Sequence, residues 1–312
     1  MKAIILERYG DVEGFKMVED RIPDPNENEV LLEVAATSLN AIDWKIRQGS
    51  LKEVLKLKLP LIMGWDVSGV IRKVGEKVTT FKPGDEVFAR AKLFKPGGFT
   101  EFMVLEEKLL VLKPKNLSFE IAAAIPLTGT TAWTALSDEA NVKNNEKVLI
   151  HGGSGGIGSF AVQFAKHFGA TVVATASGEN EAYVRSLGVD EFIDYKKEDF
   201  SAKEGIYDVV LDTQGGDVQQ KSFKVLKEGG RLVSLISEPD EDLAKSKNIT
   251  ATYLNNNKPS VEQMKEIGRL ISEGVIKPPH IEVFPFTLEG VRQAHQLGEA
   301  GGIKGKMVVQ IK

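Results

Sequence analysis

A glycine-rich segment in the middle of the chain has the spacing of a loop that holds phosphate groups. Residues 152–158 read G-G-S-G-G-I-G, so Gly153, Gly155 and Gly158 form a G-x-G-x-x-G pattern between an apolar, strand-like run and a helical pattern. We interpret Gly153 as permitting the tight turn, Gly155 as letting the backbone approach a pyrophosphate, and Gly158 as allowing close helix–strand packing. The amides at the helix N-terminus would then face the two phosphates of a dinucleotide.

The type of dinucleotide depends on the end of the next strand. About 20 residues after the glycines, an NAD-specific site supplies Asp or Glu for the ribose 2′-hydroxyl. This chain has Ser177 and Gly178 there, and the first acid is Glu179. A missing carboxylate permits a 2′-phosphate, to which the Ser177 hydroxyl can donate, although Asn180 stands where a lysine would select it more strongly. We therefore predict NADPH in preference to NADH.

The composition argues against a metal centre and against charged macromolecular partners. The chain has no cysteine, which excludes disulfides, thiolate-bound zinc and iron–sulfur clusters. The four histidines are His151, His167, His280 and His295. They show no H-E-x-x-H or other tight ligand spacing, so we expect no metal and no zinc. A net charge of −4 provides no basic field for nucleic acid or an acidic membrane, and we expect neither partner. The first residues, MKAIILERYG, resemble a strand rather than a signal peptide, which predicts a cytoplasmic protein.

The elements that must position the glycine loop suggest an α/β protein with two lobes. A length of 312 residues exceeds the ~250–300 that one compact domain usually reaches. Short strands separated by Gly and Pro are expected up to about residue 117: Lys2–Leu6, Glu29–Ala36, Asp66–Val74 and Glu86–Ala89. From about residue 147, apolar strand-like runs alternate with helical patterns, which predicts a parallel sheet covered on both faces. The helix Thr287–Glu299 and the strand Met307–Ile311 do not extend this alternation and can return to the first lobe.

Several further segments resemble the medium-chain dehydrogenase/reductase superfamily over essentially the whole chain. They are Gly64-Trp65-Asp66-Val67-Ser68-Gly69-Val70, Phe81-Lys82-Pro83-Gly84-Asp85-Glu86-Val87, Pro126-Leu127-Thr128-Gly129-Thr130-Thr131-Ala132-Trp133 and the glycine loop. Within it, Leu39–Lys45, Glu107–Leu110 and Gly305–Val309 look like the zinc-independent quinone oxidoreductase branch, particularly enone/alkenal oxidoreductases. The zinc-dependent members carry a His-Glu pair where this chain has Trp65-Asp66, and they use cysteine ligands that do not exist here.

The resemblance implies a fold and a set of site residues. The fold would be a GroES-like β-rich catalytic domain, residues 1–118 with 278–312, and a Rossmann doubly wound parallel-sheet domain, residues 119–277, with a cleft between them and a homodimer. Cofactor contacts would come from residues in both domains: Lys45, Thr131, Gly153, Gly155, Gly156, Ile157, Gly158, Ser177, Tyr195 and Lys306. Asn40, Asp43 and Lys45 are the candidate catalytic residues.

The expected reaction is NADPH-dependent reduction of a quinone, or of the C=C bond of an enone or enal. It requires a hydride, a stabilised enolate oxygen and a proton. Because no metal is expected, hydrogen-bond donors must polarise the carbonyl. The Asn40 amide and the Lys45 ammonium are candidate donors, and water can supply the proton. Each candidate has a structural alternative: Asn40 can brace a turn, Asp43 can cap a helix, Tyr195 can pack, and Lys45 or Lys306 can be solvated. An NADPH-binding sensor or structural protein with little turnover is the competing hypothesis.

Overall fold

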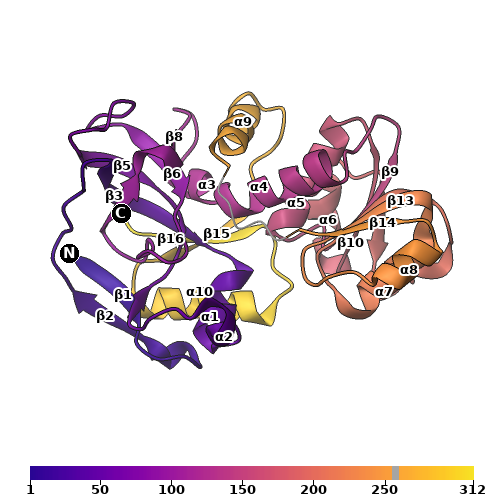
Figure 1. Ribbon diagram of the computed structural model, residues 1–312, viewed down its shortest axis with the longest axis horizontal. Helices are drawn as coiled ribbons and strands as arrows, with labels where there is room; N and C mark the ends of the chain where they lie inside the picture. The colour runs from indigo at the N-terminus through magenta and orange to yellow at the C-terminus, as the bar shows by residue number, and fades with distance from the viewer. Residues whose placement is uncertain (255–259) are drawn as a thin grey trace. The chain divides into compact units, whose positions relative to one another are not determined.

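The computed structural model describes residues 1–254 and 260–312, and these divide into two compact units. The first contains residues 1–127 and the described residues from 260 onward, and the second contains residues 128–254. No helix within the described ranges is long and apolar enough to cross a membrane. Figure 1 labels the helices and strands of both units.

The described part of the first unit is built on two sheets. The larger has the strand order β15-β16-β3-β5-β6-β8, with β7 also paired to β3, and the smaller has the order β2-β1-β4. The strands are β1 (Lys2–Leu6), β2 (Phe15–Glu19), β3 (Glu29–Leu39), β4 (Leu61–Ile62), β5 (Asp66–Val74), β6 (Glu86–Arg90), β7 (Phe102–Glu106), β8 (Leu110–Leu112), β15 (Ile281–Pro285) and β16 (Lys306–Gln310). The helices are α1 (Ala41–Gln48), α2 (Lys52–Leu55), α3 (Phe119–Ala123), α9 (Val261–Ser272) and α10 (Leu288–Ala300). The C-terminal strand β16 pairs antiparallel with β3, so the chain returns to the first unit.

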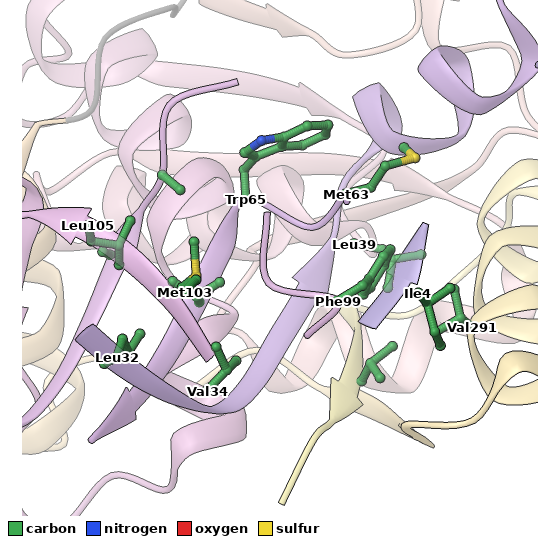
Figure 2. Close-up of a cluster of buried hydrophobic side chains, with 14 of the residues drawn as sticks. Ile4, Leu32, Val34, Leu39, Met63, Trp65, Phe99, Met103, Leu105 and Val291 are labelled. Carbon is green, nitrogen blue, oxygen red and sulfur yellow. The ribbon is translucent and has the colours of Figure 1, made fainter. Parts of the chain in front are cut away.

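The core of the first unit forms between the sheets and α10. Alternating residues of β3 point inward, as Leu32 and Val34 do, and Met103 of β7 lies opposite Leu32 in the sheet. Figure 2 shows these side chains in one cluster with Trp65 and Val291. Trp65 is only 5% exposed, and its indole N–H donates to the carbonyl oxygen of Lys95 at 3.0 Å.

The second unit is a doubly wound parallel sheet. Its strand order is β11-β10-β9-β12-β13-β14, so the order reverses direction next to β9. The strands are β9 (Lys147–His151), β10 (Thr171–Ala176), β11 (Glu191–Asp194), β12 (Tyr207–Asp212), β13 (Leu226–Ser234) and β14 (Thr250–Tyr253). The helices are α5 (Gly156–His167), α6 (Glu181–Ser186), α7 (Gly216–Val225) and α8 (Glu241–Ser246). The strands β9, β10 and β12 are almost entirely buried, as strands covered on both faces must be.

The division between the units differs from the expected boundaries at residues 118 and 277. Helix α3 packs on β3 and β5, and the Ser68 hydroxyl donates to the carbonyl oxygen of Phe119 at 2.6 Å. Helix α9 also belongs to the first unit, where it packs against β8, and the Asn116 amide donates to the carbonyl oxygen of Ser272 at 2.9 Å. Helix α4 (Pro126–Trp133) contains the first boundary, and a π-helical segment, Thr134–Glu139, continues it.

Candidate functional site

The glycine loop joins β9 to α5 at the point where the strand order reverses. A Cβ on Gly158 would lie 2.1 Å from the carbonyl oxygen of Gly152, and one on Gly153 would lie 2.8 Å from the Ala174 Cβ. Gly158 therefore allows the first turn of α5 to pack closely on the loop that follows β9. The role of Gly153 is different from the prediction: the left-handed turn residue is Gly152, with φ +68°, and Gly153 is needed because β10 approaches it closely.

The first turn of α5 presents backbone N–H groups and open space. Gly155 is the N-cap residue, and a Cβ there would meet only the Gly152 carbonyl oxygen, at 3.5 Å. The first helical N–H bond is Ser159 N–H to Gly155 O, at 2.9 Å. The amides of Gly156 and Ile157 precede it and have no acceptor within the helix. This loop fits a pyrophosphate, because the donors and the helix dipole meet where no side chain stands.

The two glycines give a matched test of this loop. Gly158→Ala should lower the free energy of unfolding by about 1–3 kcal/mol, because the added methyl overlaps the Gly152 carbonyl. Gly155→Ala should cost less than about 1 kcal/mol, yet weaken NADPH binding about tenfold or more by filling the open space. Denaturant unfolding and NADPH fluorescence titration measure the two effects. Unchanged NADPH binding in Gly155→Ala would contradict the pyrophosphate assignment.

Polar groups gather where β10 and β11 end. Ser177 is 7% exposed, and the Asn180 side chain donates to the hydroxyls of Ser177 at 3.3 Å and Ser154 at 3.2 Å. Asn180 thus connects the end of β10 to the glycine loop, a role that the sequence did not reveal. Tyr195 is 57% exposed, so its ring is accessible rather than packed in the core.

Asp194 and Lys197 also border this region, and the sequence prediction missed both. A Cβ on Gly178 would lie 2.5 Å from the Asp194 carboxylate and 3.7 Å from the Lys197 ammonium. Burial opposes ionisation of Asp194, but hydrogen bonds from Lys196 N–H and Lys197 hold its pKa below the usual range. The Lys196-Lys197 pair, which begins two residues after the end of β11, is the signal that could have identified a positive group beside Gly178.

His151, the last residue of β9, is part of a buried hydrogen-bonded network. Its ring nitrogens lie 3.1 Å from the hydroxyls of Thr175 and Ser222. Ser222 donates its own proton to the Val218 carbonyl, so it accepts from His151 Nε2–H, and Nδ1 then accepts from Thr175. Burial lowers the pKa of His151 to about 4, against the opposing charge of Asp212, so the ring is neutral near pH 7.

A second group of polar side chains lies inside the first unit. Asn40, Asp43, Asp66 and Lys306 are each at most 5% exposed. The Asn40 amide donates to Asp66 Oδ2 at 2.9 Å and accepts from Lys306, whose ammonium also donates to the carbonyl oxygen of Leu39. Asp43 accepts the backbone N–H of Asn40 at 2.7 Å, so it caps α1 from the third position inside the helix and not a helical turn that follows it.

Burial shifts the titration of all three charged groups in this buried polar network. It raises the pKa of Asp43 to about 7, against a hydrogen bond from Asn40 and the positive charge of Lys306. It also raises the pKa of Asp66, against the charges of Lys306 and Arg90. Burial lowers the pKa of Lys306 to about 8, although both carboxylates oppose this. Three ionisable groups with altered pKa values in one place are typical of functional sites.

The structure brings together only some of the predicted site residues. Asn40, Asp43 and Lys306 meet, and Asp66 joins them although it was not predicted. Lys45 is exposed on α1 and takes no part in the two hydrogen bonds of the Lys306 ammonium. Thr131 is buried in α4, in the second unit. Asp66 could have been found from the Gly64-Trp65-Asp66 motif, since it places an acid at the start of a buried strand.

Where the zinc-dependent members carry a His-Glu pair, this chain keeps one carboxylate, Asp66, but has no metal-binding atom at position 65. Trp65 places an indole there, whose nitrogen carries a hydrogen and donates to a backbone carbonyl. Within residues 1–254 and 260–312, no group of three or more His, Asp or Glu side chains is arranged to hold a metal ion.

Comparisons with known proteins match both parts of the chain. Residues 26–115 match the family model of the alcohol dehydrogenase GroES-like domain, and residues 187–309 match that of zinc-binding dehydrogenases. The chain is 37% identical to 2-methylene-furan-3-one reductase of Solanum lycopersicum, over 99% of this chain and 79% of that protein. It is 38% identical to the chloroplastic NADPH-dependent alkenal/one oxidoreductase of Arabidopsis thaliana, again over 99% and 79%. The quinone oxidoreductase from Coxiella burnetii has a similar structure, with a TM-score of 0.93, 36% identity and coverage of 100% of this chain and 99% of that chain.

Proposed function

Because the chain belongs to the medium-chain dehydrogenase/reductase superfamily, among the quinone oxidoreductases and enone/alkenal reductases, and is an oxidoreductase, we propose a specific reaction for it. The proposed reaction is the zinc-independent, NADPH-dependent reduction of quinones or of the C=C bond of α,β-unsaturated carbonyl compounds. The names of the relatives supply both acceptor classes and, for the alkenal/one oxidoreductase, the cofactor.

The observation that carries the proposal is the open first turn of α5. Gly155 leaves space in front of the amides of Gly156 and Ile157, which suits a pyrophosphate. The hydroxyl of Ser177 can donate a hydrogen bond to a 2′-phosphate, and the ammonium of Lys197, which pairs with Asp194 at 3.3 Å, is a second donor beside Gly178. Bound NADPH would supply the hydride.

The residues of the buried polar network would stabilise the acceptor oxygen. Asn40 is the donor in this proposal, because an amide N–H can polarise a carbonyl and bind the negative charge that develops on it. Asp66 and Lys306 hold that amide from its two ends. Polarisation by hydrogen bonds replaces polarisation by zinc, which is consistent with an indole at position 65 and with the lack of cysteine. Water supplies the proton of the α-carbon in this scheme.

A spectrophotometric panel tests the proposal. The fall in nicotinamide absorbance is followed with NADPH and, separately, NADH, against 1,4-benzoquinone, 9,10-phenanthrenequinone and a 2-alkenal, with and without chelator. A saturated primary alcohol with NADP⁺ is the control for zinc-type chemistry. We expect turnover of a quinone or enal with NADPH that survives chelation, and an inert alcohol. NADPH binding without turnover of any acceptor would instead favour the sensor or structural role.

Two properties expected from the sequence stay predictions. We propose a homodimer and a cytoplasmic location. Sedimentation equilibrium of the purified chain tests the first, and fractionation of the source cells tests the second.

A further inference from the structure

Lys306 occupies an unusual position for a lysine. It begins β16 and is 3% exposed, whereas Lys304, two residues earlier, is exposed. Its ammonium donates to the Leu39 carbonyl and to Asn40 Oδ1. A buried ammonium has a large desolvation cost, so the fold tolerates it only with compensating partners. Such a group is costly to keep for packing alone.

The bonds of the Asn40 side chain fix which end of the amide faces which neighbour. Oδ1 faces the Lys306 ammonium, and Nδ2 donates to Asp66 Oδ2 at 2.9 Å. Turning the amide over would place its NH₂ group against the ammonium and its carbonyl against the carboxylate, and both contacts are repulsive. The orientation is therefore set by charge on both sides. Nδ2 carries two hydrogens, and the bond to Asp66 uses one of them.

We propose that Lys306 is a positioning residue for Asn40: its ammonium keeps the amide turned so that the second N–H of Nδ2 is directed at the oxygen of the quinone or enone. The inference rests on the proposed function and deepens it. It also differs from the sequence prediction for Lys306, because the lysine acts through Asn40 and not on the cofactor. The ammonium provides the local positive charge beside the donor, and Asp66 holds the other end of the amide.

Substitution of Lys306 provides the direct test. Lys306→Met should lower kcat about 10–100-fold, the usual range for loss of a group that orients a functional residue. The KM for the acceptor and the Kd for NADPH should stay within about twofold of wild type. Lys304→Met is the matched control, because it removes an exposed lysine from the same segment, and it should leave kcat unchanged. Lys306→Arg keeps the charge and should recover part of the lost kcat.

The pH dependence of kcat separates positioning from a purely structural role. Burial lowers the pKa of Lys306 to about 8, and above this pH a neutral amine can accept as well as donate a hydrogen bond. Asp66 then orients the amide alone and less firmly, so wild-type kcat should fall above pH 8. In Lys306→Arg this alkaline limb should move to higher pH, because a guanidinium stays charged.

A double-mutant cycle completes the test. If Lys306 acts through Asn40, adding Lys306→Met to Asn40→Ala should reduce kcat by no more than about twofold further. Provided that the wild-type protein turns over, three results would each overturn the inference. They are full kcat in Lys306→Met, an additive loss of kcat in the double variant, and a main effect of Lys306→Met on NADPH binding. Absence of wild-type turnover would instead overturn the proposed function on which the inference rests.

Discussion

Replacing Asn40 by alanine should lower kcat about 10²–10³-fold, the cost of removing one hydrogen-bond donor to a developing oxyanion. The KM for the acceptor should change little, because the interaction strengthens as negative charge reaches the oxygen. The Kd for NADPH should change much less than kcat, because the proposed partner of the Asn40 amide is the acceptor oxygen and not the cofactor. Steady-state kinetics over the acceptor panel, together with NADPH fluorescence titration, measure these effects.

The Asn40→Ala variant also leaves part of the network unpaired, so stability must be measured beside activity. Lys306 still donates to the Leu39 carbonyl oxygen, and Asp66 still accepts the backbone N–H of Leu127 at 3.0 Å. The free energy of unfolding should therefore fall by only about 1–3 kcal/mol. Asn28→Ala, at an exposed position, is the control. A folded Asn40→Ala protein with wild-type kcat would show that Asn40 serves only to begin α1.

The local parts of the site could be predicted from the sequence, because their signals lie within short segments. The glycine loop was placed between the right strand and helix, and β1 (Lys2–Leu6) and β5 (Asp66–Val74) have the predicted bounds. The functions of individual glycines were less predictable. Gly152 takes the left-handed turn and Gly153 faces Ala174, and that distinction depends on how β10 packs beside the loop.

The buried polar network could not be predicted as a unit, because its members come from distant segments. Asn40 and Lys306 are 266 residues apart and meet only because β16 pairs with β3. The sequence marked Lys45 as the lysine beside Asn40, but on α1 that side chain is exposed to solvent. The same long-range packing moved the boundaries of the units, since α9 lies on β8 in the first unit.

His295 should make the protein sensitive to acid, and replacing it should relieve that sensitivity. The ring is fully buried between Phe15 and Phe99, and neither nitrogen has a hydrogen-bond partner among the described residues. Burial, together with the nearby positive charge of Arg47, lowers its pKa to about 3. Below pH 6.5 the unfolded chain binds a proton at this histidine, whereas the folded chain does not. The free energy of unfolding therefore falls by up to about 1.4 kcal/mol per pH unit down to about pH 3.

The contribution of His295 must be measured as a difference, because other buried groups titrate in the same range. His151 acts in the same direction, between pH 6.5 and about 4, whereas the raised pKa values of Asp43 and Asp66 make the folded chain bind protons first and oppose the loss. These terms are common to wild type and to His295→Leu, so they cancel in the comparison. Between pH 7 and pH 5, the free energy of unfolding of His295→Leu should rise by about 2 kcal/mol relative to that of wild type. Denaturant unfolding at the two pH values measures this difference. The control is His167→Gln, at an exposed position, which should show no such gain. If the free energy of unfolding depends on pH in the same way in wild type and in His295→Leu, the folded protein accepts the proton at His295 and the prediction is wrong.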